Sequence, residues 1–449
     1  MLLFATTTGY QTRAFGAAAE RLGVELAFAT DRCDQIDDPW QDGAIPIRFH
    51  EEDRSVAAIV EESRARPIDG VLVVGDRPTA IAARVAQALG LPWHPPYAVA
   101  AAKNKVLARE RFRAVGLSTP WFVPLALSPD RIGSLDSPSL GPAIGFPCVV
   151  KPLALSASRG VMRADDDASL AAAVHRLRGL MSSPDLRAER NPAHEYGLIE
   201  EFIPGREYAV EAVLHHGELK VLTIFDKPDP LDGPFFEETI YVTPSRAPEA
   251  EQAAIVETIG RAAAALGLHH GPVHAECRVR PAASSMPESP EETAARVYVL
   301  EVAARPIGGL CAQALRFELD GGEPAPLEEM LLRHALGGAP PSCWRLEPGA
   351  SGVMMIPIPR RGTYRSVDGV DSASAVPHVS SIQITAKPDQ LLVPLPEGAS
   401  YLGFIFARAD APADVEAALR AAHAALRFRI DTEFPVLGAG PVHYNHVHG

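Results

Sequence analysis

The 449-residue sequence has no long apolar run, no excess of basic charge, few cysteines and few lysines. Its formal net charge of −14 argues against a general nucleic-acid binder, which would carry a basic surface. No apolar stretch approaches the length that a bilayer requires, and the opening Met1-Leu-Leu-Phe-Ala lacks the charged start of a secretory leader. These absences predict a cytoplasmic protein with no nucleic-acid or membrane partner.

Cysteine is too scarce and too irregularly spaced to indicate a metal site or a disulfide framework. The five cysteines stand at positions 33, 148, 277, 311 and 343, so we expect reduced, mostly buried thiols. A hydrophobic content of 47% is enough for several cores, and the length predicts a soluble enzyme of two to four domains.

Lysine is replaced by arginine almost everywhere, which makes each remaining lysine informative. Only six lysines, at 103, 105, 151, 220, 227 and 387, occur among the 42 basic residues. Lys151 ends the apolar run that starts at Ile144, and a small-residue turn at 156–161 follows it. Such a turn lets backbone N–H groups approach phosphate oxygens while a lysine supplies charge. The pairing indicates a phosphate site, although short Ser/Gly turns after strands are common on their own.

Two glutamates downstream add a candidate metal site. Glu276 and Glu301 each close a strand-like run, and Arg305 follows the second. Mg²⁺ is usually held by one or two carboxylates together with the phosphates of its substrate. An arbitrary glutamate pair would merely face solvent, but the upstream lysines favour an ATP-using enzyme that holds Mg²⁺, with Mn²⁺ as the alternative metal.

Several motifs together resemble the ATP-grasp superfamily and, within it, the L-amino acid ligases that make dipeptides. They are Asn104-Lys105 with the helix after it, Phe146-Pro-Cys-Val-Val-Lys151-Pro, Ser158-Arg-Gly160-Val and Leu198-Ile-Glu-Glu-Phe-Ile-Pro-Gly-Arg-Glu207. The resemblance implies an ATP site that contains Lys105, Lys151, Ser158, Gly160, Glu200, Glu201, Ile203 and Glu207. It further implies metal ligation by Glu276 and Glu301, and places Arg305 beside the acyl phosphate and the tetrahedral intermediate.

Two departures from the family pattern bear on the site. Most ATP-grasp enzymes carry asparagine two residues after the second metal glutamate, where this chain has Ala303. Waters or the triphosphate would then complete the metal coordination. Gly308-Gly309 stands where some dipeptide ligases place a bulky aromatic, and we hypothesise a roomier pocket there.

Two further side chains are candidates for catalysis. In the dipeptide ligases the loop that follows Ile224 contributes an acidic residue to the amino group of the first amino acid, and Glu238 or Glu237 is the candidate here. A solvated acidic loop is an equal alternative. His274 lies two residues before Glu276 on one strand face and could contact phosphate or an acyl group, or could be a structural histidine.

The order of elements predicts an α/β fold with α+β lobes: an ATP-grasp fold that starts with a Rossmann-like domain. Strands at 2–6, 25–29 and 70–74 alternate with helices at 14–22 and 79–89, which favours a parallel sheet. We expect an entry domain at 1–112, a subdomain carrying Lys151 at 113–195, a subdomain carrying the adenine hinge and the metal glutamates at 196–342, and a C-terminal lid at 343–449.

Three segments are weaker candidates. Thr6–Tyr10 lies where α/β folds place ligands but lacks the dinucleotide glycine fingerprint, so packing is slightly favoured. Residues 281–292 read as a polar surface loop. The tail histidines 443, 446 and 448 could bind metal, but a frayed terminus is favoured and we assign them no role.

The sequence therefore predicts an ADP-forming ligase that joins an amino acid carboxylate to an amine through an acyl phosphate. The alternatives are an ATP-grasp carboxylase or purine-pathway ligase, and a non-catalytic ATP-binding protein. A homodimer is suggested only by the resemblance.

Overall fold

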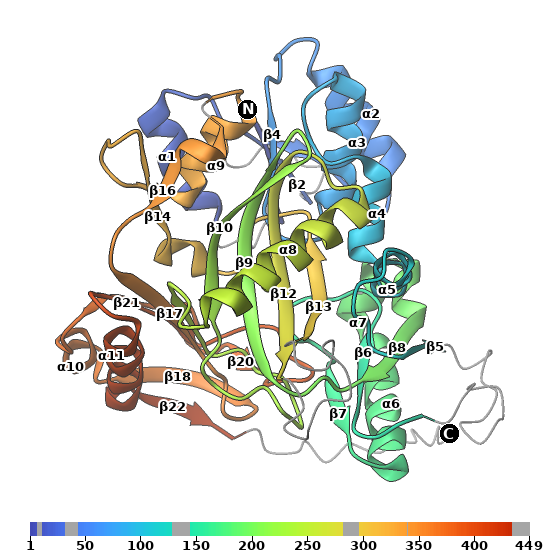
Figure 1. The fold of residues 1–449 in the computed structure, drawn as a ribbon, viewed down its shortest axis with the longest axis vertical. Helices are drawn as coiled ribbons and strands as arrows, with labels where there is room; N and C mark the ends of the chain where they lie inside the picture. The colour runs from blue at the N-terminus through green and yellow to red at the C-terminus, as the bar shows by residue number, and fades with distance from the viewer. Residues whose placement is uncertain (7–10, 32–43, 128–143, 282–295, 339, 433–449) are drawn as a thin grey trace, which may run out of the picture.

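The computed structural model describes residues 1–6, 11–31, 44–127, 144–281, 296–338 and 340–432. Figure 1 shows the chain wrapped around a long central sheet, with N-terminal elements at one end and C-terminal elements at the other. Most of the loop at Thr6–Tyr10, nearly all of the loop at 281–292 and the whole histidine tail lie outside the described residues.

The N-terminal part is a parallel sheet covered by helices, as the alternating pattern predicts. Strands β1 (Leu2–Phe4), β2 (Ala27–Thr30), β3 (Ile45–Pro46) and β4 (Val71–Val73) lie in the order β3-β2-β1-β4. Helix α1 (Thr12–Leu22) connects β1 to β2, α2 (Glu52–Glu62) connects β3 to β4, and α3 (Thr79–Leu89) follows β4. The carboxyl end of β4 leads directly into Asp76, and such strand ends are where α/β folds place ligands.

Two helices lead from this sheet toward the rest of the chain. Helix α4 (Pro96–Lys103) and helix α5 (Lys105–Ala114) are separated by Asn104 alone. The Asn104 side chain accepts a hydrogen bond from the Leu107 amide at 3.1 Å, which is the usual capping interaction for a helix start. Lys105 is thereby fixed in the first turn of α5.

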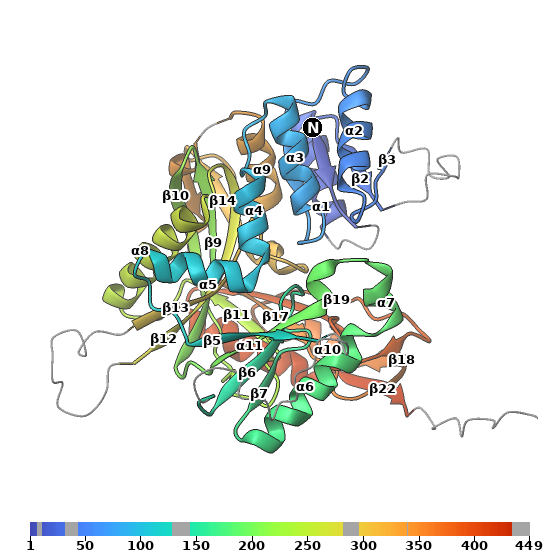
Figure 2. The same ribbon diagram turned by 90° about the vertical axis from the view of Figure 1, so that its right-hand side faces the viewer.

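A small antiparallel sheet carries Lys151. Its order is β5-β8-β6-β7, with β5 (Phe122–Ala126), β6 (Cys148–Pro152), β7 (Met162–Ala164) and β8 (Tyr196–Glu201). Helix α6 (Asp167–Met181) packs its apolar residues on this sheet, and α7 (Pro184–Ala188) follows it (Figure 2). Lys151 and Glu200 therefore come from neighbouring strands.

The central sheet has eight strands in the order β13-β12-β9-β10-β11-β17-β21-β19. Its first five strands are β9 (Arg206–His215), β10 (Glu218–Asp226), β11 (Ile240–Thr243), β12 (Gly271–Arg280) and β13 (Arg296–Ala303). Helix α8 (Glu249–Leu266) crosses one face of the sheet (Figure 1). The two glutamates predicted to bind the metal lie inside β12 and β13, not at strand ends as the sequence suggested.

Between the central sheet and the C-terminal strands, a short excursion returns the chain to the N-terminal part. It contains the 3-10 helix η5 (Cys311–Ala314), β14 (Arg316–Leu319), β15 (Ala325–Pro326), α9 (Leu327–Ala335), the 3-10 helix η6 (Pro341–Cys343) and β16 (Trp344–Leu346). Strands β15, β14 and β16 form a sheet of their own, and α9 packs against α1.

The C-terminal strands extend the central sheet, so this part is not a separate layer. They are β17 (Ala350–Ile356), β19 (Val379–Ile384) and β21 (Gly403–Ala409), and β17 pairs with β11. Strands β18 (Gly362–Asp368), β20 (Leu391–Leu392) and β22 (Arg427–Asp431) form a second small sheet, whereas helices α10 (Val370–Ser374) and α11 (Pro412–Ala425) pack on the C-terminal strands of the central sheet. The fourfold division of the chain stays a prediction.

Among the described residues, no helix has both the length and the apolar character needed to cross a bilayer. The four cysteines in the described part of the chain are unpaired, and three of them are buried, as expected.

Candidate nucleotide and metal site

One cavity collects most of the predicted site residues. It lies between the small antiparallel sheet and the β9-β12-β13 end of the central sheet, and encloses about 830 Å³ including its open mouth. Of the predicted residues, those that line it are Lys105, Lys151, Ser158, Glu200, Glu201, Ile203, Glu207, Glu238, Glu276, Glu301 and Arg305. Gly160 and His274 are not among the lining residues.

The end of the cavity near residues 198–207, the predicted adenine hinge, is apolar. Val149, Phe202 and Phe236 belong to a small buried cluster and line the wall together with Ile203. The Ile203 carbonyl accepts a hydrogen bond from Arg278 Nη1 at 2.9 Å, which fixes the hinge backbone. A slot with apolar walls and a fixed backbone edge suits a flat heteroaromatic ring.

Glu200 positions Lys151. Arg109 Nε donates to one carboxylate oxygen of Glu200 at 3.1 Å, and Lys151 donates to the other. Burial lowers the pKa of Lys151 to about 8, although Glu200 opposes this shift. Glu200 therefore orients the lysine, and a direct contact of Glu200 with the nucleotide stays a prediction.

Four residues of the turn at 156–161 line the cavity: Ser156, Ala157, Ser158 and Val161. Ala157 and Ser158 both have φ +54°, a left-handed conformation that side chains other than glycine rarely adopt. Strained backbone of this kind is concentrated at ligand-binding segments.

Gly160 has a structural part in the same turn. Its N–H donates to the Pro396 carbonyl at 2.8 Å, and a Cβ there would lie 3.0 Å from Leu180. Arg159 Nε likewise donates to the Glu397 carbonyl at 2.8 Å. The Gly160 amide thus holds the C-terminal segment against the turn, and a role of Gly160 in phosphate binding stays a prediction.

The two glutamates predicted to bind the metal face each other across neighbouring strands. Glu276 on β12 pairs in register with Glu301 on β13, and a β-bulge follows between Glu276 and Cys277. Like charges directly opposite in a sheet are destabilising, and bulges redirect side chains near active sites. Lys105 Nζ lies 3.9 Å from Glu301 and donates to the Leu155 carbonyl at 3.0 Å. A paired set of carboxylate oxygens beside a cation suits a hard divalent ion bound with phosphate.

Lys227 sits at the centre of the acidic cluster. Its Nζ donates to Glu207 at 2.8 Å and to Glu238 at 2.5 Å, and lies 3.5 Å from Glu276. Carboxylate oxygens of these three glutamates lie within 4.8 Å of one another. Burial opposes the charge of Lys227, but the three carboxylates raise its pKa well above the usual value. Burial and the charge of Glu276 raise the pKa of Glu238 to about 7.

His274 lies between the carboxylates of Glu211 and Glu276. Its Nδ1 lies 3.0 Å from the fully buried Glu211, and its Nε2 lies 3.7 Å from Glu276. Burial disfavours the imidazolium, but hydrogen bonding to the two carboxylates outweighs it and raises the pKa of His274 to about 9. The geometry favours the structural alternative, in which His274 holds Glu276 in place and does not touch substrate.

Arg305 is clamped by the N-terminal part of the chain. Its Nε and Nη2 donate to the two carboxylate oxygens of Asp76 at 2.8 and 3.0 Å. Burial would raise the pKa of Asp76, but Arg305 outweighs burial and lowers it. A bidentate pair of this kind fixes the plane of the guanidinium.

A second cavity opens beside the first, enclosing about 920 Å³ including its mouth. Lys105, Leu155, Ser156 and Glu301 line both cavities. The cations that line the second one are Lys103, Lys105, Arg77 and Arg159. Two adjoining chambers that share Glu301 and Lys105 could present two substrates to one reaction centre.

The glycine pair does not widen the pocket in the way that the sequence suggested. Gly309 has φ +61°, and a Cβ there would lie 3.3 Å from the buried Phe404 ring. Phe404 comes from β21, so an aromatic ring occupies this space from another part of the chain. A Cβ at Gly308 would meet only Arg305, at 4.0 Å.

Sequence reasoning missed four residues that shape the site: Asp76, Arg109, Lys227 and Arg278. A signal existed for Lys227, because it was one of the few lysines and lay in an acidic loop. For Asp76 the signal was its position after a parallel strand. Arg109 and Arg278 looked like ordinary arginines, and only their burial reveals them.

Comparison with known families agrees with this geometry. The family model for the ATP-grasp domain matches residues 144–314, that for the L-amino acid ligase C-terminal domain 2 matches 354–431, and that for the ATP-grasp N-terminal domain matches 16–93. The first range contains the cavity-lining strands β6, β8, β9, β12 and β13 and every predicted site residue except Lys105.

Solved structures support the same assignment. The L-amino acid ligase from Bacillus licheniformis superposes with a TM-score of 0.74 at 25% identity, covering 96% of this chain and 99% of that one. N5-carboxyaminoimidazole ribonucleotide synthetase from Thermotoga maritima superposes with a TM-score of 0.63 at 15% identity, covering 96% of this chain and 99% of that one, and shares the fold.

Among curated sequences, carnosine synthase 1 of Gallus gallus is 30% identical over 243 residues. That match covers 52% of this chain but only 26% of the chicken protein, so the chain spans about a quarter of that relative's length. With three matching family models and a full-length structural match, the chain belongs to the ATP-grasp superfamily of ligases, in the group that carries the L-amino acid ligase C-terminal domain.

Proposed function

We propose that the protein is an ATP-dependent carboxylate–amine ligase that joins an amino acid carboxylate to the amine of a second amino acid or amine. The products would be an amide, ADP and phosphate. The observation that carries this proposal is a single cavity with an apolar slot at one end and, at the other, Lys105, Lys151 and Arg305 beside the facing pair Glu276 and Glu301.

The nucleotide would lie along this cavity, with its base in the apolar slot and its ribose near Glu207. Lys105, Lys151 and the turn at 156–158 would neutralise the phosphates. Glu276 and Glu301 are suited to hold Mg²⁺, or Mn²⁺ as the alternative; when bound, the ion would screen the phosphates and polarise the transferred group. Phosphoryl transfer mainly needs this positioning and charge stabilisation.

The donor amino acid would lie where the acidic cluster meets Arg305. Ionised Glu238 would accept hydrogen bonds from the donor's ammonium group, and Arg305 would stabilise the oxyanion when the amine attacks the acyl phosphate. The second cavity would hold the acceptor, with Lys103 as a partner for an acceptor carboxylate. The contacts of Pro396 and Glu397 with the turn would help to keep water away from the acyl phosphate.

The alternatives differ in which groups they require. A carboxylase or purine-pathway ligase would share the nucleotide site and the fold, but would not need an amino acid ammonium partner at Glu238. A non-catalytic ATP-binding protein would not need Arg305 fixed by Asp76. Cytoplasmic location and a homodimer stay predictions.

The test combines the protein with Mg-ATP and pooled amino acids, and follows phosphate release and new masses together. We expect ADP and a product whose mass is the sum of two substrates less water. ATP consumption with bicarbonate but without amino acids would favour the carboxylase, and ATP binding without turnover would favour the non-catalytic protein.

A matched pair of variants tests the donor site. Glu238→Gln should raise the KM for the donor amino acid strongly and leave that for ATP nearly unchanged. Glu237→Gln is the control, because Glu237 is the neighbouring acid and does not line the cavity. A loss of ATP affinity alone in Glu238→Gln, or equal effects of both variants, would contradict the assignment.

A further inference from the structure

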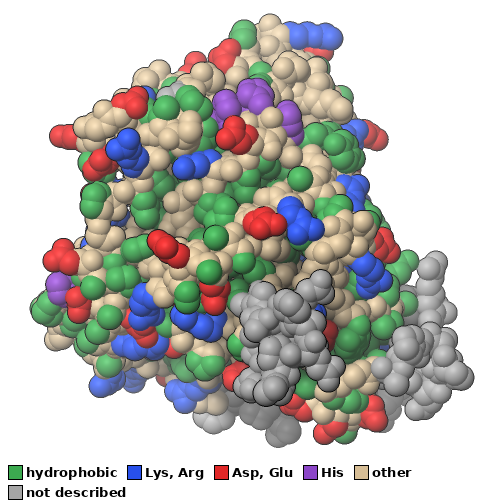
Figure 3. Space-filling model, viewed as in Figure 1, with side chains coloured by type: hydrophobic (Ala, Val, Ile, Leu, Met, Phe, Trp, Pro, Cys, Tyr) green, Lys and Arg blue, Asp and Glu red, His purple; other side chains and the backbone are tan. Residues whose placement is uncertain are grey.

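Five histidines gather at the end of the central sheet that lies away from the nucleotide cavity. Two are at the turn between β9 and β10, two precede β12, and one is on α9: His215, His216, His269, His270 and His334. Their rings contact one another, with centroid separations from 4.3 to 6.1 Å. Figure 3 shows a group of histidine side chains on this face of the molecule.

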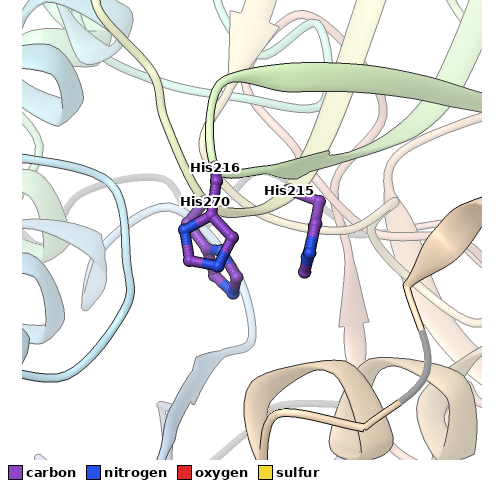
Figure 4. Close-up of side chains that lie close together, drawn as sticks. All are labelled: His215, His216 and His270. Atoms are coloured by element: carbon purple, nitrogen blue, oxygen red, sulfur yellow. The ribbon is translucent and has the colours of Figure 1, made fainter.

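Three of these histidines present ring nitrogens to one space. One nitrogen each from His215, His216 and His270 lies within 4.8 Å of the others. Figure 4 shows the three side chains projecting to the same side from the strand ends. In a tetrahedral site with Zn–N bonds of about 2.0–2.1 Å, ligand nitrogens are about 3.4 Å apart. Small side-chain rotations are therefore enough to bring the three nitrogens to that spacing.

His270 provides a second, independent observation. Its side chain is only 4% exposed, and its Nδ1 has no hydrogen-bond partner among the described residues. An unpaired buried polar atom costs about 1–3 kcal/mol, so such atoms call for an explanation. A bound cation would accept the lone pair of this nitrogen.

His334 completes the surroundings of the site. Its Nε2 lies 3.1 Å from His215 Nδ1, and its ring stacks on His270 with a centroid distance of 4.3 Å.

The turn itself accommodates His216 at a conformational cost. His216 has φ +51° and Gly217 φ +92°, and together they form the two-residue connection between β9 and β10. Such turns favour asparagine, aspartate or glycine at the first position. The histidine is thus held in a left-handed conformation with its ring in the cluster.

We propose that His215, His216 and His270 form a binding site for a divalent transition-metal cation of the Zn²⁺ class, with His334 available as a fourth nitrogen ligand. Imidazole ligands suit zinc, copper and nickel, whereas Mg²⁺ prefers oxygen. The site is separate from the catalytic cavity, because β9 extends eight residues, or roughly 26 Å, from Glu207 to His215. The ion would tie the β9-β10 turn to the start of β12.

The test is a calorimetric titration of the protein with Zn²⁺. Excess Mg²⁺ is present throughout to fill sites made of oxygen ligands. We expect one Zn²⁺ per chain and a rise in the thermal unfolding midpoint, because the ion binds only the folded site. His216→Asn is the key variant, since asparagine tolerates the left-handed turn and removes the imidazole.

Losing one ligand should weaken Zn²⁺ binding by about 100-fold or more, since even outer partners are worth about 10–100-fold. His215→Gln gives a second variant that leaves the turn intact. The control replaces the tail histidines 443, 446 and 448 and should bind Zn²⁺ like the unchanged protein. The proposal would be overturned if His216→Asn and His215→Gln both bound Zn²⁺ with wild-type affinity. It would also be overturned if the tail variant lost Zn²⁺ binding, or if the unchanged protein did not bind one Zn²⁺ per chain.

Discussion

Replacing Lys227 by methionine removes the charge that holds the acidic cluster together while keeping the length of the side chain. Lys227 is buried and contacts Glu207 at 2.8 Å and Glu238 at 2.5 Å, with Glu276 at 3.5 Å. At an effective dielectric constant of about 20, a 2.8 Å contact is worth about 6 kcal/mol before desolvation is subtracted. Removing one partner of a buried ion pair costs about 3–5 kcal/mol in practice.

The lower end of that range applies here, because two of the three glutamates keep another cation. Glu207 retains Arg278 at 2.7 Å, and Glu276 retains His274 at 3.7 Å. In the described part of the chain, Glu238 has no ion pair besides that with Lys227. We therefore expect Lys227→Met to lose about 3 kcal/mol of unfolding free energy at pH 8.

The loss should depend on pH in a definite direction. The pKa of Glu238 is already raised to about 7, and removal of Lys227 raises it further. A carboxyl group whose folded-state pKa is raised contributes stability below its unfolded pKa, near 4.5, and loses it as pH rises through the folded value. The variant should therefore be close to the wild type at pH 5.5 and much less stable at pH 8.

Denaturant unfolding at both pH values, with and without Mg²⁺, measures these effects. Mg²⁺ should stabilise the variant more than the wild type, since Lys227 no longer competes for the carboxylates; at 100 times its Kd the ion adds about 2.7 kcal/mol. Lys220→Met, an exposed lysine on β10, is the control and should change stability little. An equal loss at pH 5.5 and pH 8, or a loss below about 1 kcal/mol at pH 8, would refute the reasoning.

Three other predictions concern Asp76 and the glycine pair. Asp76→Asn keeps the shape but removes the charge that fixes Arg305, so kcat should fall by about tenfold or more while the KM for ATP changes little, measured by phosphate release; an equal rise in the ATP KM would contradict this role. Gly309→Ala should destabilise the protein by about 1 kcal/mol or more, because the residue is left-handed and faces a ring, whereas Gly308→Ala should be nearly neutral. Gly308→Leu should then narrow the range of donor amino acids in the ligation assay, and an unchanged range would show that no substrate passes there.

Local patterns predicted much of the fold because they report which chain segments can bury apolar surface. Helix α3 (Thr79–Leu89) has the predicted bounds, since its start after Pro78 and its end at Gly90 are both written in the sequence. Strand β4 is shorter than expected because burial of an apolar run does not set where its hydrogen bonds end. No local signal in the sequence revealed that the C-terminal strand β17 pairs with β11.

The sequence by itself determined which groups could do the chemistry: scarce lysines, two glutamates and an arginine at spacings that resemble one superfamily. The tertiary structure alone decided how these charges are paired, because ion pairs form between segments far apart in the chain. Asp76 reaches Arg305 across 229 positions, Arg109 reaches Glu200 across 91, and His270 meets His216 only because β12 begins beside the β9-β10 turn. The sequence shows which charged side chains are present. The role of each depends on the partners that the fold brings beside it and on how much water still reaches it.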